Sequence, residues 1–207
     1  MDIAKDFAVK LFMLKIGATP KGRLIEQHDV FFGIADDVKS LIPHFEQAWP
    51  EITDIWHLDA YRAVTAVNGY RIEVVPRAQH STDQPCVTFD DSDNKQLYFV
   101  NLGGYLPNHF EEFHHKLLIV ANNMSEAIAI AKRSEFYQQF DITGTRATSH
   151  IDDKYGVDID EIHRVADVLP KAFKTQYQLR ITADEAAKDD EMVIGYLPKK
   201  LFDSDLI

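Results

Sequence analysis

Residues 17–33, GATPKGRLIEQHDVFFG, decide how the chain is organised, because a copy that keeps only some of these residues recurs later in the sequence. The copy is GGYLPNHFEEFHHKLLI at residues 103–119. Three pairs of identical residues are each 86 positions apart: Gly17 and Gly103, Glu26 and Glu112, and His28 and His114. We therefore interpret the chain as a tandem duplication.

Composition limits the class of protein. A chain of 207 residues has room for two units of about 100 residues, each with its own core. The 33 acidic residues exceed the 22 basic ones by 11, which opposes binding to nucleic acid or to an anionic membrane surface. A single cysteine, Cys86, cannot form an internal disulfide, and we see neither a secretory signal nor an apolar run of about 20 residues. We expect a soluble cytoplasmic protein.

The first copy predicts a ββαββ unit over residues 1–76. The apolar run 10–16 predicts a buried central strand, and strand character resumes at 26–34 after an irregular loop. An amphipathic helix should follow from Asp36 and Asp37, with a kink or a broken first turn at Pro43 and its end at Pro50. Asn68-Gly69 between two β-rich segments, 57–67 and 70–75, is a strong hairpin signal.

The remaining chain predicts a linker, a second unit and an extension. Residues 77–95 are rich in Pro, Ser, Asp and Asn, as expected of a linker. Residues 96–170 repeat the ββαββ pattern, with Asn122 or Asn123 capping the helix and Glu126 near its third position. Residues 171–207 contain two strand-like segments, interpreted as a C-terminal hairpin. The expected fold is thus α+β: two tandem ββαββ units, mainly antiparallel, each with a helix on one face of its sheet, plus the hairpin.

Imidazole and carboxylate side chains recur in pairs at the strand ends. The first unit has Glu26 with His28 and His57 with Asp59, and the second has Glu112 with His114 and His150 with Asp152. Residues two apart on a strand share a face, so each pair can bind a divalent metal, act in acid–base chemistry, or fix strand register as a hydrogen-bonded polar pair. Because the GxSxG, HExxH and paired-cysteine zinc patterns are absent from the sequence, we assign no catalytic residue, no metal ligand and no cofactor.

The loop of the first unit is a candidate anion site. Lys21, Gly22 and Arg23 place two cations beside backbone amides that a carboxylate or phosphate could contact. The loop leads into a strand, so it is not a nucleotide phosphate loop, and a solvated turn with scattered charge is the alternative. The second copy has Asn108 and His109 at the positions of Gly22 and Arg23.

The segments GRLIEQHDVFFGIADDVKSLIPHFEQAWP (22–50) and HLDAYRAVTAVNGYRIEVVP (57–76) carry a family resemblance. They are similar to a bacterial family known as domain of unknown function 1543. Its members have a GR…EQHD signature, a helix ending in Trp-Pro, a His-x-Asp strand and a Val-x-Gly-Tyr-Arg-Ile hairpin, in one or two copies per chain. The first unit fits this pattern over residues 10–76. The second retains only Glu112, His114, Asp152 and the Arg164-Val165 position. The resemblance implies a bacterial cytoplasmic protein and no particular activity.

The leading functional prediction is a noncatalytic module that binds a small anionic ligand or a protein partner. Its expected ligand-binding residues all belong to the first unit: Lys21, Gly22, Arg23, Glu26, His28, Asp29, His57 and Asp59. The alternative is a metal-dependent hydrolase that uses Glu26, His28, His57 and Asp59, which requires these four side chains to converge on one point. A structural subunit that pairs as a homodimer is a third option, and it requires an exposed apolar patch.

Overall fold

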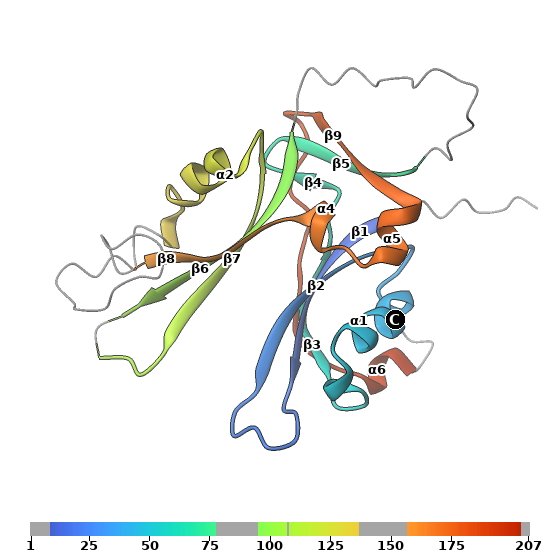
Figure 1. Ribbon diagram of the computed structural model, residues 1–207, viewed down its shortest axis with the longest axis vertical. Helices are drawn as coiled ribbons and strands as arrows, with labels where there is room; N and C mark the ends of the chain where they lie inside the picture. Colours follow the sequence, from blue (N-terminus) through green and yellow to red (C-terminus); the bar gives the residue numbers. More distant parts are fainter. Residues whose placement is uncertain (1–8, 78–94, 107, 137–156, 204–207) are drawn as a thin grey trace, which may run out of the picture. The chain divides into compact units, whose positions relative to one another are not determined.

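The structure, a computed structural model, describes residues 9–77, 95–106, 108–136 and 157–203 (Figure 1). It divides into two compact units, the first built from residues up to Ala78 together with Leu169 onward, and the second from the residues between. The architecture mixes helices with antiparallel sheets, which agrees with the α+β prediction. Among the described residues, no helix is both long and apolar enough to span a bilayer.

The main sheet of the first unit has the strand order β10-β3-β1-β2, with all neighbours antiparallel. Its strands are β1 (Lys10–Ala18), β2 (Gln27–Ala35), β3 (His57–Ala63) and β10 (Val193–Pro198). β1 lies between β2 and β3, and Leu11, Leu14 and Ile16 on it are almost completely buried. The prediction of a buried central strand at residues 10–16 is confirmed.

Proline divides the helical segment of the first unit into short pieces. A 3-10 turn, η1 (Lys39–Leu41), precedes the helix α1 (Ile42–Ala48), which has Pro43 in its first turn, and Pro50 starts a second 3-10 turn, η2 (Pro50–Ile52). This is the broken first turn predicted from Pro43, because proline is accepted only where no intrahelical N–H bond is needed. Phe45 of α1 packs edge-on against Phe31 of β2 and against Trp56.

A second sheet of the first unit has the order β4-β5-β9. β4 (Ala66–Val67) and β5 (Tyr70–Pro76) are joined by Asn68-Gly69, and both residues of this turn have positive φ, 50° and 79°. Positive φ at both central positions is what a type I′ hairpin turn requires, so this predicted hairpin is confirmed. The predicted strand 57–67 is instead two strands, since β3 ends at Ala63 and β4 belongs to the other sheet.

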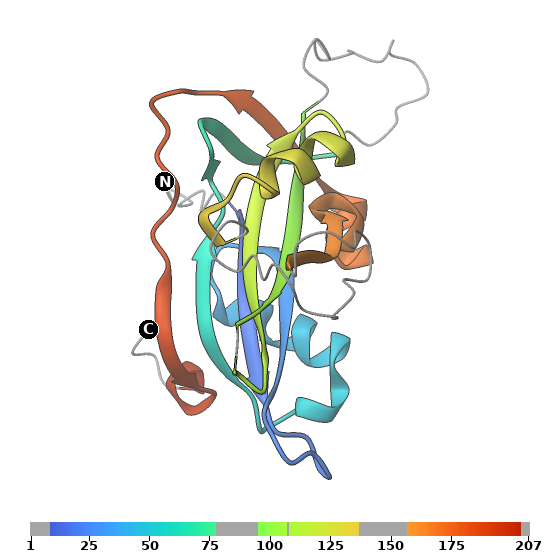
Figure 2. The ribbon, with the colours of Figure 1, turned by 90° about the vertical axis from the view of Figure 1, so that its left-hand side faces the viewer.

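The C-terminal residues do not form a hairpin with one another, so this prediction was wrong. β9 (Tyr177–Ala183) follows helix α5 (Lys171–Gln176) and pairs with β5, whereas β10 pairs with β3. β10 runs alongside β3 in Figure 2 and leads into helix α6 (Lys200–Asp203). Each strand covers an edge of a first-unit sheet whose backbone groups would otherwise be open to pairing with another chain.

The acidic segment between β9 and β10 is attached to the rest of the first unit by hydrogen bonds to its carboxylates. The carboxylate of Asp190 accepts three hydrogen bonds, from the Thr65 amide (2.6 Å), the Thr65 hydroxyl (2.6 Å) and the Ala66 amide (2.9 Å). Asp189 accepts a bond from the Asn68 amide at 2.9 Å. The negative charges of this segment therefore satisfy backbone donors at the β3–β4 bend.

The second unit has a three-stranded sheet in the order β7-β6-β8. Its strands are β6 (Gln96–Tyr105), β7 (Glu112–Ala121) and β8 (Val157–Arg164), and β8 runs into the short helix α4 (Val165–Val168). Helix α2 (Met124–Ala131) packs on one face of this sheet through Ala127 and Ala131. The order β6-β7-α2-β8 parallels β1-β2-α1-β3 of the first unit.

The N-terminus of α2 has the predicted cap. The Asn123 side chain accepts a hydrogen bond from the Glu126 amide at 2.9 Å, and the Glu126 carboxylate accepts one from the Asn122 amide at 2.8 Å. Replacing Asn123 with alanine leaves the Glu126 amide without its acceptor, so we expect the free energy of unfolding to fall by about 1 kcal/mol. Urea denaturation measures this change. Ser125→Ala, on the exposed side of the same turn, serves as the control, and an equal loss in both variants would contradict the capping role.

The strand predicted around His150 and Asp152 lies outside the described residues. The third strand of the second-unit sheet is β8, at 157–164, which the sequence pattern did not indicate. A register shift between Asn101 and Leu102 makes Asp160 an extra residue in the pairing of β8 with β6. A β-bulge interrupts the two-residue alternation of apolar side chains. The sequence spacing of Ile159 and Ile162 therefore does not indicate that they lie on one face of a strand.

Candidate functional site

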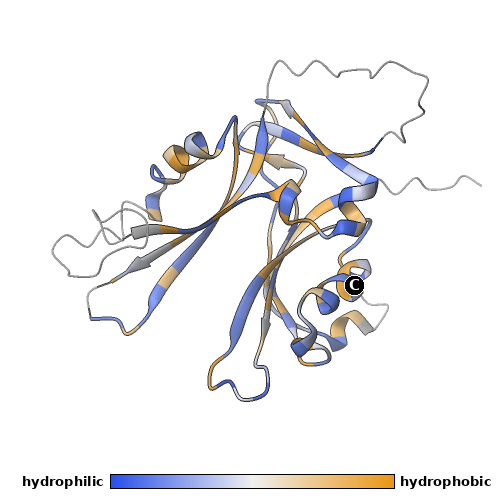
Figure 3. Cartoon of the chain, in the orientation of Figure 1, coloured by the Kyte–Doolittle hydropathy of each residue, from blue (hydrophilic) through white to orange (hydrophobic). Residues whose placement is uncertain are grey.

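Both long hairpins are polar at their loop end and buried at the other. In β2 the residues from Phe31 onward are buried while Gln27, His28 and Asp29 are accessible, and β7 shows the same gradient. Figure 3 shows mainly hydrophilic colour toward the loop ends of β1–β2 and β6–β7. The paired histidines and carboxylates lie at these polar ends.

Strand register brings two histidines together over one glycine. Gly17 on β1 is opposite His28 on β2 and also opposite His57 on β3. A Cβ atom at Gly17 would overlap His57 Nε2, would lie 2.7 Å from His57 Cε1, and would lie 3.3 Å from His28 Cδ2. Only glycine leaves room for both imidazoles to fold over the central strand.

Four side chains of the first unit form a closed ring of contacts, which we call the first-unit cluster: Glu26, His28, His57 and Asp59. His28 Nε2 lies 3.1 Å from Glu26 Oε2 and 2.9 Å from Asp59 Oδ2. His57 Nε2 lies 3.1 Å from Glu26 Oε1 and 3.1 Å from Asp59 Oδ1. Each carboxylate therefore bridges both imidazoles, so the two predicted pairs form one connected cluster.

A lysine that the sequence reasoning missed completes this cluster. Lys15 Nζ lies 3.0 Å from Asp59 Oδ2. Asp59 reaches Lys15 because a register shift between Lys15 and Ile16 bulges β3 at this carboxylate. Burial raises the pKa of Asp59, but the hydrogen bond and charge of Lys15, with the charges of His28 and His57, outweigh it and lower the pKa below its ordinary value. Asp59 is therefore a carboxylate at neutral pH.

The cluster is buried on one side and accessible on the other. His57 is 4% exposed, and the Tyr196 ring of β10 packs on it with ring centroids 4.4 Å apart. The side chains of His28 and Glu26 are 35% and 41% exposed. A ligand can therefore reach the cluster from the His28 side, while β3 and β10 hold His57 in place.

A half-open groove of about 540 Å³ lies at this accessible side. Its lining contains four of the predicted ligand-binding residues and four others: Lys21, Arg23, His28 and Asp29, with Pro20, Gln27, Trp49 and Glu51. Gly22 has φ +86°, and the Arg23 amide donates to the Pro20 carbonyl at 3.1 Å, which fits a type II turn. The turn is thus preorganised with Lys21 and Arg23 exposed on either side of Gly22.

The structure separates the predicted site residues into two groups that share one member. Glu26, His57 and Asp59 belong to the cluster, Lys21, Arg23 and Asp29 line the groove, and His28 belongs to both. The two tryptophans have different environments, because Trp49 lines the groove whereas Trp56 is 2% exposed and donates to Glu46 at 2.7 Å. The sequence reasoning missed Trp49 as a groove residue, although its position directly after helix α1 and before Pro50 could have indicated an accessible site.

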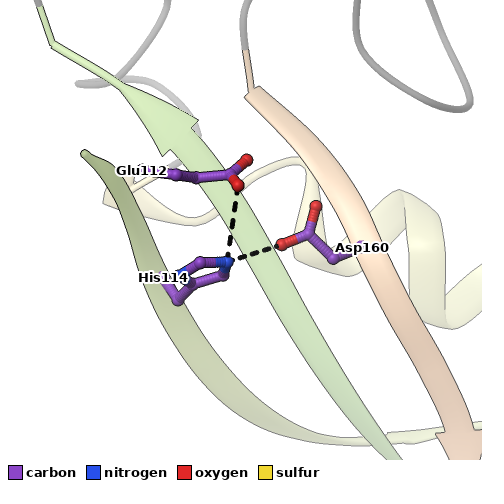
Figure 4. Close-up of side chains that lie close together, drawn as sticks. All are labelled: Glu112, His114 and Asp160. Carbon is purple, nitrogen blue, oxygen red and sulfur yellow. Dashed lines mark ion pairs between the residues drawn. The ribbon is translucent and has the colours of Figure 1, made fainter. Parts of the chain in front are cut away.

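The second unit has a smaller group of the same kind, the second-unit cluster: Glu112, His114 and Asp160 (Figure 4). His114 Nε2 lies 3.1 Å from Asp160 Oδ2 and 3.7 Å from Glu112 Oε2. Gly103 is opposite His114 on β7 and opposite Asp158 on β8. By register, Asp158 and Asp160 take the places of His57 and Asp59, and the predicted pair His150 and Asp152 lies outside the described residues.

Tyr105 adjoins the second-unit cluster and was not singled out from the sequence. Its hydroxyl forms a hydrogen bond with Glu112, and it is the last residue of β6, two positions after Gly103. Burial, followed by the charge and hydrogen bond of Glu112 and the charge of Asp160, raises the pKa of Tyr105 above its ordinary value. Its hydroxyl therefore stays protonated at neutral pH and can donate to Glu112.

Comparisons with known proteins agree with part of this description. A family model described as Domain of Unknown Function (DUF1543) matches residues 23–74, which hold all four members of the first-unit cluster. No curated protein matches the chain. Among solved structures, the crystal structure of a protein Il1583 from Idiomarina loihiensis has a TM-score of 0.54 and 22% sequence identity, over 92% of this chain and 97% of that chain. This likeness concerns the fold alone.

Proposed function

We propose that the protein is a noncatalytic binding module whose first unit holds a small anionic ligand in the groove beside the first-unit cluster. The observation that carries this proposal is the double position of His28, which lines the groove with Lys21 and Arg23 and also contacts Glu26 and Asp59. An anionic group between Lys21 and Arg23 would thus lie next to an imidazole held by two carboxylates. Arg23 supplies the planar donors that suit carboxylate and phosphate.

The lining also indicates what else the ligand carries. Asp29 and Glu51 line the same groove as the two cations. A purely anionic molecule would be repelled by these carboxylates, whereas a hydroxyl, amide or ammonium group would be stabilised by them. We therefore expect a small ligand with an anionic group and hydrogen-bond donors, and the Trp49 ring offers apolar contact area.

The noncatalytic assignment is supported by Lys15. Its ammonium contacts Asp59 and supplies the positive charge that a bound metal would otherwise supply. Both carboxylates of the cluster contact both imidazoles at 2.9 to 3.1 Å, so each one already has partners within the cluster. The cluster in this state holds His28 at the groove and fixes the register of three strands.

The test uses inorganic phosphate and O-phosphoserine as probes, with amide shifts of the labelled full chain as the readout. We expect shifts centred on residues 20–29, and tighter binding of O-phosphoserine because its ammonium can pair with Asp29 or Glu51. Replacing Lys21 and Arg23 together with glutamine should weaken binding at least about tenfold, because two charge-assisted hydrogen bonds are lost.

The control removes the same charge elsewhere in the first unit, through Lys10→Gln with Lys171→Gln, both exposed. This variant should bind the probes as the natural chain does. Equal weakening of probe binding in both double variants would show that binding depends only on the net charge of the protein. Absence of any localised shift with either probe would overturn the anionic-ligand proposal.

A metal-dependent hydrolase is a second candidate, favoured by the contacts of both imidazoles with both carboxylates in the first-unit cluster. Ligand atoms 2.0–2.2 Å from a tetrahedral ion lie about 3.3–3.6 Å apart, close to the contacts of 2.9–3.1 Å observed here. Elemental analysis of the purified chain and of His57→Ala decides between the candidates. A stoichiometric metal that is lost in His57→Ala, and retained in a His163→Ala control, would favour the hydrolase.

We also infer that the two units are tandem copies, the second one diverged. This is supported by the 86-residue offset of Gly17, Glu26 and His28, and by a register shift at Lys15/Ile16 that recurs 86 residues later at Asn101/Leu102. A β-bulge beside a functional residue is a feature that duplication would preserve. We place this module in the bacterial cytoplasm, as the family resemblance and the single cysteine suggest.

A further inference from the structure

We propose that Glu112, His114 and Asp160 bind a divalent cation in the second unit, at an oxygen-rich site that suits manganese or ferrous iron. This inference does not depend on the anionic-ligand proposal, because it concerns different residues in the other unit. It also gives the diverged copy a role of its own.

The geometry of the second-unit cluster suits one ion. One ligand atom from each residue can be chosen so that all three lie within 4.8 Å of one another. Two ligands 2.0–2.2 Å from a common ion are at most about 4.4 Å apart, so only small side-chain movements are needed. Figure 4 shows the carboxylates of Glu112 and Asp160 directed toward His114 from two strands. Placement on paired strands holds the ligands in a defined arrangement.

The two clusters differ at the position of Lys15, and the second one holds two carboxylates beside a single imidazole. Asn101 is 86 residues after Lys15, at the same side of the register shift, and its amide donates to Glu161 at 2.8 Å. Position 101 thus carries a neutral amide where the first unit has the ammonium that contacts Asp59. Two carboxylates held close together gain most from a divalent ion, since like charges in contact repel each other.

The backbone below the cluster leaves space for the ligands. A Cβ atom at Gly103 would overlap Asp160 Oδ2 and would lie 2.6 Å from Glu112 Oε1. The glycine therefore allows both carboxylates to approach over the central strand. The β-bulge at Asp160 turns this side chain to the same face as His114.

Ligand number and type indicate the class of ion. Three protein ligands leave positions for water or a substrate, as in catalytic rather than structural metal sites. Two carboxylates with one imidazole are a harder ligand set than the His- and Cys-rich sites typical of zinc, which favours manganese or ferrous iron. The Tyr105 hydroxyl, bonded to Glu112, orients that carboxylate in the way outer-shell groups do at metal sites.

The test is a titration of the chelator-treated full chain with manganese chloride, with free Mn²⁺ measured by electron paramagnetic resonance. We expect one ion to bind, and expect Asp160→Asn and His114→Ala each to weaken this binding at least about tenfold. Glu161→Gln, the neighbouring carboxylate on β8, is the matched control and should bind as the natural chain does. Circular dichroism of each variant shows whether the fold is retained, and Glu112→Gln provides a further mild substitution.

His57→Ala separates this inference from any metal binding at the first unit, because it alters only the first-unit cluster. Manganese binding that survives His57→Ala and is weakened in Asp160→Asn supports the second-unit site. Binding that is unchanged in Asp160→Asn, His114→Ala and Glu112→Gln would overturn it, as would a folded natural chain that leaves Mn²⁺ free.

Discussion

Replacing Gly17 with alanine is expected to disrupt the first-unit cluster without removing any of its charged groups. The new methyl group would overlap His57 Nε2 and would crowd His28 at 3.3 Å. His57 cannot simply move aside, because it is 4% exposed and is covered by Tyr196. We expect the free energy of unfolding to fall by about 1–3 kcal/mol, as for overpacked interiors, and both imidazoles to lose their present contacts.

The measurement combines urea denaturation with imidazole NMR signals of His28 and His57. Gly33→Ala is the matched control, since its methyl group would overlap Leu41 in the core and leave the cluster untouched. We expect comparable destabilisation in both variants, with altered imidazole signals only in Gly17→Ala. Unchanged His57 signals in Gly17→Ala would show that the glycine does not form the floor of the cluster.

Replacing Asp190 with alanine is expected to have the larger effect on stability. One carboxylate is lost as acceptor for the amides of Thr65 and Ala66 and for the Thr65 hydroxyl. Hydrogen bonds to charged groups contribute about 1.5–3 kcal/mol, and partly buried donors left unpaired add to the cost. We expect a loss of about 2–3 kcal/mol in the free energy of unfolding.

Hydrogen exchange of the Thr65 and Ala66 amides should be faster in Asp190→Ala than in the natural chain. Glu191→Ala removes the same charge one residue later from an exposed position, and we expect it to change stability by less than about 0.5 kcal/mol. If both variants lose the same small amount, Asp190 does not anchor the segment that returns to the first unit.

Local signals in the sequence were sufficient for much of the fold. The apolar run of β1, the proline-divided helix, the Asn68-Gly69 hairpin and the Asn123 cap each depend on neighbouring residues, and each is found where expected. Partners distant in sequence were not accessible in this way. β9 and β10 join strands more than 100 residues earlier, and nothing within 171–207 indicates that choice.

Most residues of the candidate site could be predicted from the sequence, but the contacts between them could not. Alternation placed Glu26 with His28 and His57 with Asp59, whereas the ring of contacts between the two pairs depends on strand order. The sequence did not indicate Asp160, because the β-bulge that directs its side chain toward His114 also breaks the alternation of apolar residues around it. Lys15 looked like an interruption of an apolar strand, and only the pairing of β1 with β3 shows that it meets Asp59.

The pairing of β10 with β3 has a consequence for synthesis of the chain on the ribosome. The first unit is discontinuous in sequence, since β9 and β10 are translated after the whole of the second unit. Until they emerge, β3 and β5 present open edges that a neighbouring nascent chain could pair with. The second unit, continuous in sequence, can fold first. Lys199, which is translated after the second unit, then reaches Glu46 and Asp54 and joins β10 to the helical segment of the first unit.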